Sequence, residues 1–151
     1  MPYWFDGNNL IGKSVEAIKA DPKICRAFLS TLSSFHKSGG GRFLVYFDGD
    51  DTNRMASPPG VAVRYSAPTS ADDAIISRLL EIQRPAEVIV VTNDRALQNR
   101  CRNAGAMTMD WHQFTAKMRS RSASARRSKD LQESVDVEDW MKYFGLDKED
   151  I

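Results

Sequence analysis

Five short apolar segments, separated by stretches with helical spacing, constrain the fold of this chain more than any other feature. The apolar segments cover residues 2–5, 43–47, 61–65, 88–92 and 106–109. The second and fourth are almost continuously apolar, which is typical of strands buried on both faces of a parallel sheet. Apolar residues recur with helical spacing over residues 24–35, 74–82, 96–101 and 111–118. This alternation predicts an α/β fold with a central, mostly parallel sheet of about five strands and helices on both faces.

The composition indicates one soluble domain with an extension. The chain has 151 residues, of which 42% are hydrophobic and 27% charged, and this length suits one core but not two. No apolar segment reaches the length of a signal sequence or a membrane span. Cys25 and Cys101 lie too far apart in the sequence for a metal-ligand motif, so we expect both to be buried, reduced thiols. Together these features predict a cytoplasmic location.

Charge divides the chain near residue 129. Residues 1–129 hold 19 Lys and Arg against 12 Asp and Glu, whereas residues 130–151 hold 2 against 8, so the formal net charge of +1 is the sum of two opposite parts. We therefore expect a globular domain over residues 1–118, and over 119–151 a basic linker followed by an acidic amphipathic C-terminal helix.

This extension allows several interpretations. The basic run is either a solvated linker or an arm that contacts phosphates. The acidic part carries Val137, Trp140, Met141 and Phe144 at helical spacing. It would dock on its own domain, bind a partner protein, or fold back over the basic surface.

Acidic side chains follow the ends of several predicted strands. Asp6 and Asp48 come directly after the first and second strands, Asp94 follows the fourth, and Asp72 and Asp73 open the helix after the third. Because ligand sites of parallel sheets lie beyond the carboxyl ends of the strands, we expect these acids to meet. Clustered carboxylates repel one another, and a hard divalent cation compensates for that repulsion. The pattern predicts a Mg²⁺ or Mn²⁺ site and metal-assisted hydrolysis of a phosphodiester.

Each of these acids also has a structural interpretation. An aspartate after a strand is commonly a helix N-cap or a turn residue, and Asp48 opens the turn-like sequence Asp48-Gly49-Asp50-Asp51-Thr52. Asp72 and Asp73 would be favoured in a first helical turn by the helix dipole alone.

The residues around Asp6 carry a family resemblance. Asp6-Gly7-Asn8-Asn9-Leu10-Ile11 resembles the Asp-Gly-Tyr-Asn-Leu-Ile opening of YacP-like NYN domains, a branch of the PIN-like ribonucleases. The similarity continues through residues 45–48, 60–66, 70–73, 90–95 and 105–106, and so covers about residues 3–118.

The resemblance implies a PIN-like three-layer sandwich and a metal-dependent, usually endonucleolytic, attack on RNA. Asp6, Asp48, Asp72 and Asp94 would form the catalytic and metal-binding cluster, with Asp73 as a further metal ligand. Asn9 would position substrate or a metal-bound water. Members of this family have been linked to cleavage of messenger RNA on the ribosome, which makes ribosome-associated RNA a candidate substrate.

Candidate RNA contacts lie near the predicted site or on the helix that follows Asp94. They are Arg54, Asn93, Arg95 and Arg100. An ion pair with a neighbouring carboxylate is the alternative role for Arg95, and its place directly after Asp94 favours that role over a phosphate contact. A solvated helix face is the alternative for Arg100.

Two other functions compete with the nuclease hypothesis. The first is a PIN-like module that docks RNA or protein with little or no catalysis, because Ile75-Ile76 stand where the family often has a glutamate. The second is a phosphatase of the haloacid-dehalogenase type, with Asp48 as nucleophile and Asp50 as acid and base. That motif normally follows the first strand, whereas Asp48 follows the second predicted strand.

Overall fold

The structure is a computed structural model that describes residues 2–39, 41–50 and 56–121. Its elements follow one another as β1 (Pro2–Asp6), α1 (Gly7–Ile11), α2 (Val15–Ala20), α3 (Lys23–Lys37), β2 (Arg42–Phe47), β3 (Val61–Tyr65), α4 (Ala71–Glu81), the 3-10 turn η1 (Pro85–Glu87), β4 (Ile89–Val91), α5 (Arg95–Asn103) and β5 (Met107–Met109). A further helix covers residues 111–121.

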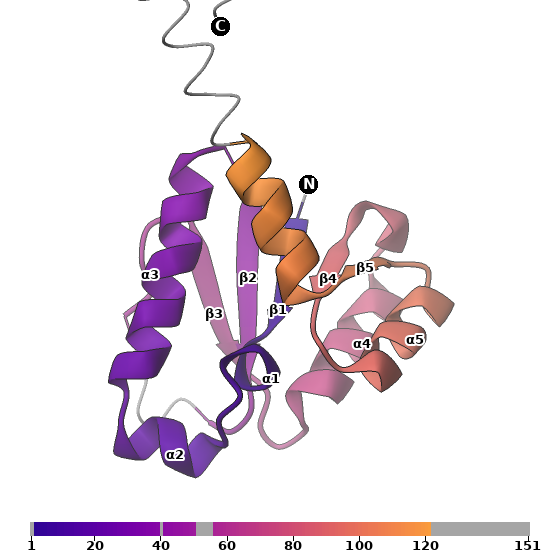
Figure 1. Cartoon of the computed structure of the whole chain (residues 1–151). Coiled ribbons are helices and arrows are strands. Elements are labelled where there is room, and N and C mark those ends of the chain that lie inside the picture. Colours follow the sequence, from indigo (N-terminus) through magenta and orange to yellow (C-terminus); the bar gives the residue numbers. More distant parts are fainter. Residues whose placement is uncertain (1, 40, 51–55, 122–151) are drawn as a thin grey trace, which may run out of the picture.

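The strands form one parallel sheet in the order β3-β2-β1-β4-β5 (Figure 1). This confirms the predicted five-stranded parallel sheet. The central strand β1 pairs with β2 on one side and with β4 on the other. The carboxyl end of β1, where Asp6 lies, is therefore flanked by the ends of both neighbouring strands.

Helices cover both faces of the sheet, as predicted. Successive residues of a strand point to opposite faces, so β1 contributes to two separate cores. Tyr3 and Phe5 pack on one face with α3 and with Phe114 of the helix at 111–121. Trp4 packs on the other face with Ile75 of α4 and with α5. The result is the three-layer sandwich that the sequence predicts.

Two short helices at the carboxyl edge of the sheet, α1 and α2, were not predicted. Helix α1 begins directly after Asp6 and lies against the end of β2. A Cβ at Gly7 would lie 2.5 Å from Cε1 of Phe47 and 3.0 Å from the carbonyl oxygen of Tyr46. Only glycine therefore lets the chain turn into α1 at this distance from β2.

The cysteine prediction is confirmed. Cys25 and Cys101 are both buried and unpaired. Burial raises the pKa of the Cys25 thiol to about 11 and that of Cys101 to about 12, so both stay protonated and unreactive at neutral pH.

Some predictions concern residues beyond the described ranges. The helix at 111–121 continues past residue 118, where the basic linker was expected to begin, and the remainder of the expected linker and the acidic C-terminal helix, at residues 122–151, lie outside the described residues and stay predictions. Within the described ranges, no helix has the length and apolarity needed to span a membrane.

Candidate active site

The predicted acids lie at one edge of the sheet, where the strands end. Asp6 is the last residue of β1, Asp48 follows β2 directly, and Asp94 caps α5 just after β4. Asp72 lies in the first turn of α4. Segments far apart in the sequence therefore deliver carboxylates to the carboxyl edge of the sheet, as expected for a parallel α/β fold.

Of these acids, Asp6 lies in the environment that is least favourable for an ionised carboxylate. Its side chain is 3% exposed. Burial is the main cause that raises its pKa from 3.8 to about 7, and the charges of Asp72, Asp48 and Asp94 raise it further. The hydroxyl of Thr92 donates a hydrogen bond to Oδ2 of Asp6 at 3.0 Å and partly opposes this rise. Ionised Asp6 is thus a buried charge among like charges.

The pKa of Asp72 is raised by burial and by the charges of Asp94 and Asp48, which also raise the pKa of Asp6. The side chain of Asp72 is half-buried, and burial is again the main cause that raises its pKa. The charges of Asp94 and Asp48 raise that pKa further, whereas Arg100 lowers it. The charges of Asp48, Asp72 and Asp94 all raise the pKa of Asp6, and those of Asp48 and Asp94 raise the pKa of Asp72, so the four carboxyl groups lie near one another. We call these four residues the acidic cluster.

Asp48 and Asp94 also have the structural roles that the sequence left open. Oδ1 of Asp48 accepts a hydrogen bond from the backbone N–H of Ala71 at 2.7 Å and so holds the start of α4. Oδ1 of Asp94 caps α5 by accepting from the backbone N–H groups of Ala96 and Leu97. Among the described residues, Oδ2 of either acid accepts no hydrogen bond. Within the described ranges, hydrogen bonds thus occupy only Oδ1 of each carboxylate.

The two asparagines of α1 bind the ends of the neighbouring strands. Oδ1 of Asn8 accepts from the backbone N–H of Asp48 at 2.8 Å. Oδ1 of Asn9 accepts from the backbone N–H of Asn93 at 2.9 Å and lies 3.1 Å from the hydroxyl of Thr92. These bonds fix the position of Asp48 and of the segment that carries Asp94. Asn9 is exposed, and its predicted contact with substrate or metal-bound water stays a prediction.

Thr92 is the site residue that sequence reasoning missed. It is fully buried, and its hydroxyl lies within hydrogen-bond distance of both Asp6 and Asn9. The same oxygen accepts from the backbone N–H of Asp94 at 3.1 Å. Its place in Thr92-Asn93-Asp94, between a strand and a helix cap, was the only signal for this role in the sequence.

Asp73 is not among the charges that raise the pKa of Asp6, although its charge adds to the rise for Asp72. Its Oδ1 pairs with Nη2 of Arg100 at 3.0 Å, and this ion pair links α4 to α5. Both side chains are about half exposed, so the pair contributes little to stability. The predicted metal-ligand role of Asp73 and the predicted RNA contact of Arg100 would each require this pair to open.

The other predicted RNA contacts differ in what surrounds them. Arg95 is exposed and forms no ion pair with any described residue, so its alternative role as the partner of a neighbouring carboxylate is not observed. Oδ1 of Asn93 accepts from the backbone N–H of Trp111 at 3.0 Å and holds the start of the last helix. Arg54 lies outside the described residues.

The acidic cluster offers oxygen ligands of the kind that a hard divalent cation prefers, but these ligands do not surround a cation completely. In the described parts of the chain, no three His, Cys, Asp or Glu residues are arranged so that they could hold a metal ion together. The donors are carboxylate oxygens, which Mg²⁺ prefers, and Mg²⁺ is commonly held by one or two carboxylates with water and phosphate as the other ligands. The residues present therefore fit an open Mg²⁺ or Mn²⁺ site.

A three-layer parallel fold with acids at this edge is the architecture expected of a PIN-like nuclease domain. The sequence pattern of the YacP-like NYN domain family matches residues 4–149, and the chain belongs to that family. The resemblance noted in the sequence is thus confirmed, and the match extends past residue 118. A search of curated proteins found no match.

Solved structures support the same fold. The chain is similar to the crystal structure of Rae1 (YacP) from Bacillus subtilis in its W164L mutant form, with 19% identity, a TM-score of 0.65, and coverage of 87% of this chain and 83% of that one. A second crystal structure of Rae1 (YacP) from Bacillus subtilis gives 18% identity, a TM-score of 0.63, and coverage of 95% and 92%. Membership of a nuclease-like family supports RNA hydrolysis at the family level, and it argues against the phosphatase hypothesis.

Proposed function

We propose that this protein is a metal-dependent endoribonuclease that hydrolyses phosphodiester bonds of RNA in the cytoplasm. Mg²⁺ or Mn²⁺ would bind at the acidic cluster of Asp6, Asp48, Asp72 and Asp94, held directly by one or two of these carboxylates, with water and phosphate as its other ligands. A cation bound there supplies an activated water and stabilises negative charge on the phosphate and the leaving oxygen.

The burial of Asp6 is the observation that carries this proposal. A carboxyl group with a pKa of about 7 is partly protonated at neutral pH, and among the described residues only the hydroxyl of Thr92 stabilises its ionised form. A structural role alone gives no reason to place it next to three other acids at a solvent-facing edge. A divalent cation would stabilise the ionised form and draw the cluster together.

The chain's own residues would orient the reacting groups. Thr92 and Asn9 fix the ends of β1 and β4 relative to each other, which keeps Asp6 and Asp94 in place without the cation. Arg95, exposed and without an ion partner among the described residues, is the cation best placed to contact an RNA phosphate. Asn93, Arg100 and Arg54 are the other proposed contacts. Ribosome-associated messenger RNA remains the proposed cellular substrate.

A PIN-like binding module without catalysis is the second candidate. Ile75 is fully buried in the core between α4 and the sheet, and Ile76 is half-buried, so neither position supplies the acid that the family often has there. Asp73, the nearest other acid, pairs with Arg100. These two facts favour a weakened site over a complete one.

Cleavage of single-stranded RNA with Mg²⁺, with Mn²⁺ and with EDTA distinguishes the two functions. We expect metal-dependent cleavage by the wild type and a loss of about 10²-fold or more in Asp6→Asn and Asp94→Asn. Asparagine caps a helix as well as aspartate does, so Asp94→Asn tests the charge and not the fold.

Asp110→Asn is the matched control. Asp110 caps the helix at 111–121 at the same edge of the sheet, through the backbone N–H of Gln113, but it is not part of the acidic cluster. This variant should cleave at the wild-type rate. Binding of RNA without cleavage in any metal would support the binding module, and cleavage that persists in EDTA would rule out the proposed mechanism.

A further inference from the structure

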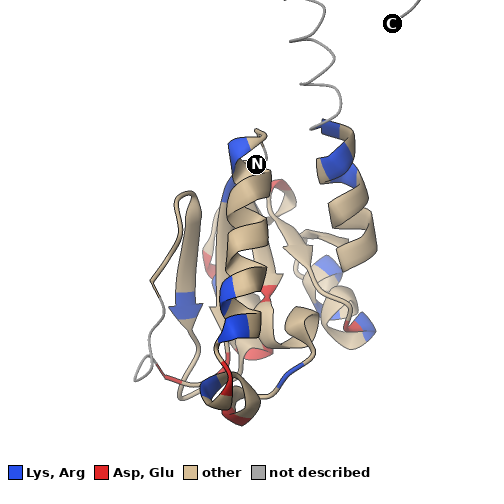
Figure 2. Cartoon of the chain, turned by 60° about the vertical axis from the view of Figure 1, so that its left-hand side comes forward, with Lys and Arg blue, Asp and Glu red and all other residues tan. Residues whose placement is uncertain are grey.

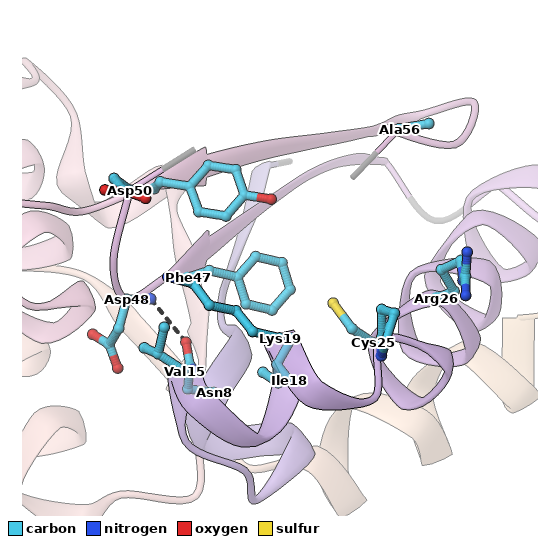
Figure 3. A pocket seen from close by; sticks show the side chains of 12 residues that line it. Asn8, Val15, Ile18, Lys19, Cys25, Arg26, Phe47, Asp48, Asp50 and Ala56 are labelled. Atoms are coloured by element: carbon cyan, nitrogen blue, oxygen red, sulfur yellow. Dashed lines mark hydrogen bonds between the residues drawn. The ribbon is translucent and has the colours of Figure 1, made fainter. Parts of the chain in front are cut away.

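A cavity of about 470 Å³ lies beside the acidic cluster (Figure 3). It is lined by residues of α1 and α2, the start of α3, and the ends of β2 and β3. Its volume falls within the range of about 300–1,000 Å³ that is usual for small-molecule sites. Asp48 belongs both to this cavity and to the acidic cluster, so the two spaces adjoin.

The wall of the cavity is mainly apolar and aromatic. Val15 and Ile18 line it, and α2 has no fully buried residue because its apolar side chains lie along this space. Phe47 and Tyr65 are paired in register, with ring centroids 6.0 Å apart and planes inclined by 30°. The Cys25 sulfur and the Phe47 ring both point into the cavity in Figure 3. Such a wall suits a flat apolar group.

Charges lie at the two ends of the cavity. Asp48 and Asp50 are at one end and Arg26 at the other, with the Phe47 ring and Cys25 between them (Figure 3). Lys19 of α2 also lines the cavity, and Figure 2 shows basic positions of α2 and of the first turns of α3 close together, with acidic positions beside them. Lys19 and Arg26 are exposed, and neither forms an ion pair with a described residue. Both are therefore available to an anion outside the apolar wall.

We propose that this cavity binds one nucleobase of the RNA next to the bond that is cleaved. The base would pack against the partly exposed side chains of Val15, Ile18 and Tyr65, with the buried Phe47 ring behind them, as single-stranded bases pack on aromatic and apolar side chains. The phosphate on one side of that nucleotide would lie at the acidic cluster, and the phosphate on the other side would contact Lys19 and Arg26. This inference rests on the proposed ribonuclease function and names a substrate subsite for it.

Titration with mononucleotides, followed by amide NMR in EDTA, tests the subsite without catalysis. Adenosine, guanosine, cytidine and uridine 5′-monophosphates are the probes, and ribose 5-phosphate is the control that lacks a base. We expect at least one mononucleotide to shift the amide signals of Val15, Ile18 and Tyr65 with a dissociation constant below about 10 mM, and ribose 5-phosphate to leave them in place. Equal shifts from ribose 5-phosphate, or shifts confined to another surface, would overturn the proposal.

Variants at the ends and in the wall sharpen the test. Lys19→Ala with Arg26→Ala changes only exposed side chains and should weaken mononucleotide binding about fivefold. Arg42→Ala with Arg119→Ala removes the same charge from exposed positions outside the cavity and should change binding less than about twofold. Val15→Trp should fill the cavity and abolish the base-dependent shifts. Equal effects of the two double variants would contradict the assigned phosphate contact.

RNA cleavage by the same proteins separates this inference from the proposed function. If the wild type cleaves RNA and the Lys19→Ala, Arg26→Ala variant keeps its KM, the subsite is wrong and the ribonuclease stands. If mononucleotides bind in the cavity but RNA is not cleaved in any metal, the cavity assignment stands as a nucleotide site and the ribonuclease is wrong.

Discussion

Replacing Asp6 with asparagine should stabilise this protein at alkaline pH, even though it should abolish activity. The folded protein raises the pKa of Asp6 from 3.8 to about 7, mainly through burial. The folded state therefore binds this proton more tightly than the unfolded chain does. The contribution of Asp6 to the free energy of unfolding is therefore greatest below about pH 4. It falls as the pH rises from about 4 to about 7, and it stays low above that range.

The size of the effect follows from the two pKa values. Full ionisation of Asp6 costs the folded state about 4 kcal/mol, and about 2–3 kcal/mol of this is lost between pH 5 and pH 8. Asp72, whose pKa is also raised by burial, adds a loss of the same sign. Asparagine keeps an acceptor for the Thr92 hydroxyl but carries no charge, so the contribution of residue 6 disappears in the variant.

Urea unfolding in EDTA at pH 5, 6, 7 and 8 measures this difference. The free energy of unfolding of the wild type should fall by about 2–3 kcal/mol more than that of Asp6→Asn over this range. Asp110→Asn removes an acid at the same sheet edge and should keep the wild-type slope. Identical slopes in the wild type and Asp6→Asn would refute the claim that Asp6 is a buried, destabilised carboxylate.

Three further substitutions test the packing around the site. Thr92→Val removes the hydroxyl that donates to Asp6, and we expect a loss of about 1–3 kcal/mol in urea unfolding at pH 8 together with a higher pKa of Asp6 by NMR; an unchanged pKa would contradict this bond. Gly7→Ala places a methyl group against the Phe47 ring and should cost about 1–3 kcal/mol, whereas a gain in stability would show that the ring moves aside. Tyr3→Phe removes a buried hydroxyl that has no partner among the described residues. The free energy of unfolding should therefore stay the same or rise by about 1 kcal/mol, and the melting temperature should stay the same or rise with it. A clear loss would reveal an unseen partner of that hydroxyl.

The sheet could be predicted from the sequence because burial on both faces leaves a direct signal. The strand at residues 61–65 was predicted at its observed bounds, and the long amphipathic helices α3, α4 and α5 were located by their apolar spacing. The short helices α1 and α2 have no such spacing. Helix α1 depends on its contact with the distant strand β2 and on the close approach at Gly7, and α2 packs on α3.

The acids of the site could be predicted because the ends of parallel strands meet at one edge. Their individual partners could not, because these depend on side-chain distances across the chain. Thr92 reaches Asp6 from 86 residues away, and Asp73 pairs with Arg100 across two helices. Arg95, for which a carboxylate partner was the alternative role, has no ion pair in the described ranges, and the nearby Arg100 has one instead.

Anomalous scattering from crystals soaked in Mn²⁺ tests the central claim most directly. The acidic cluster predicts a peak at the carboxyl edge of the sheet, within about 2.0–2.3 Å of a carboxylate oxygen of Asp6 and of at least one of Asp48, Asp72 and Asp94. The same soak of Asp6→Asn crystals should show a weaker peak or none. A wild-type map with no peak at this edge, or with its peak elsewhere on the protein, would contradict the account.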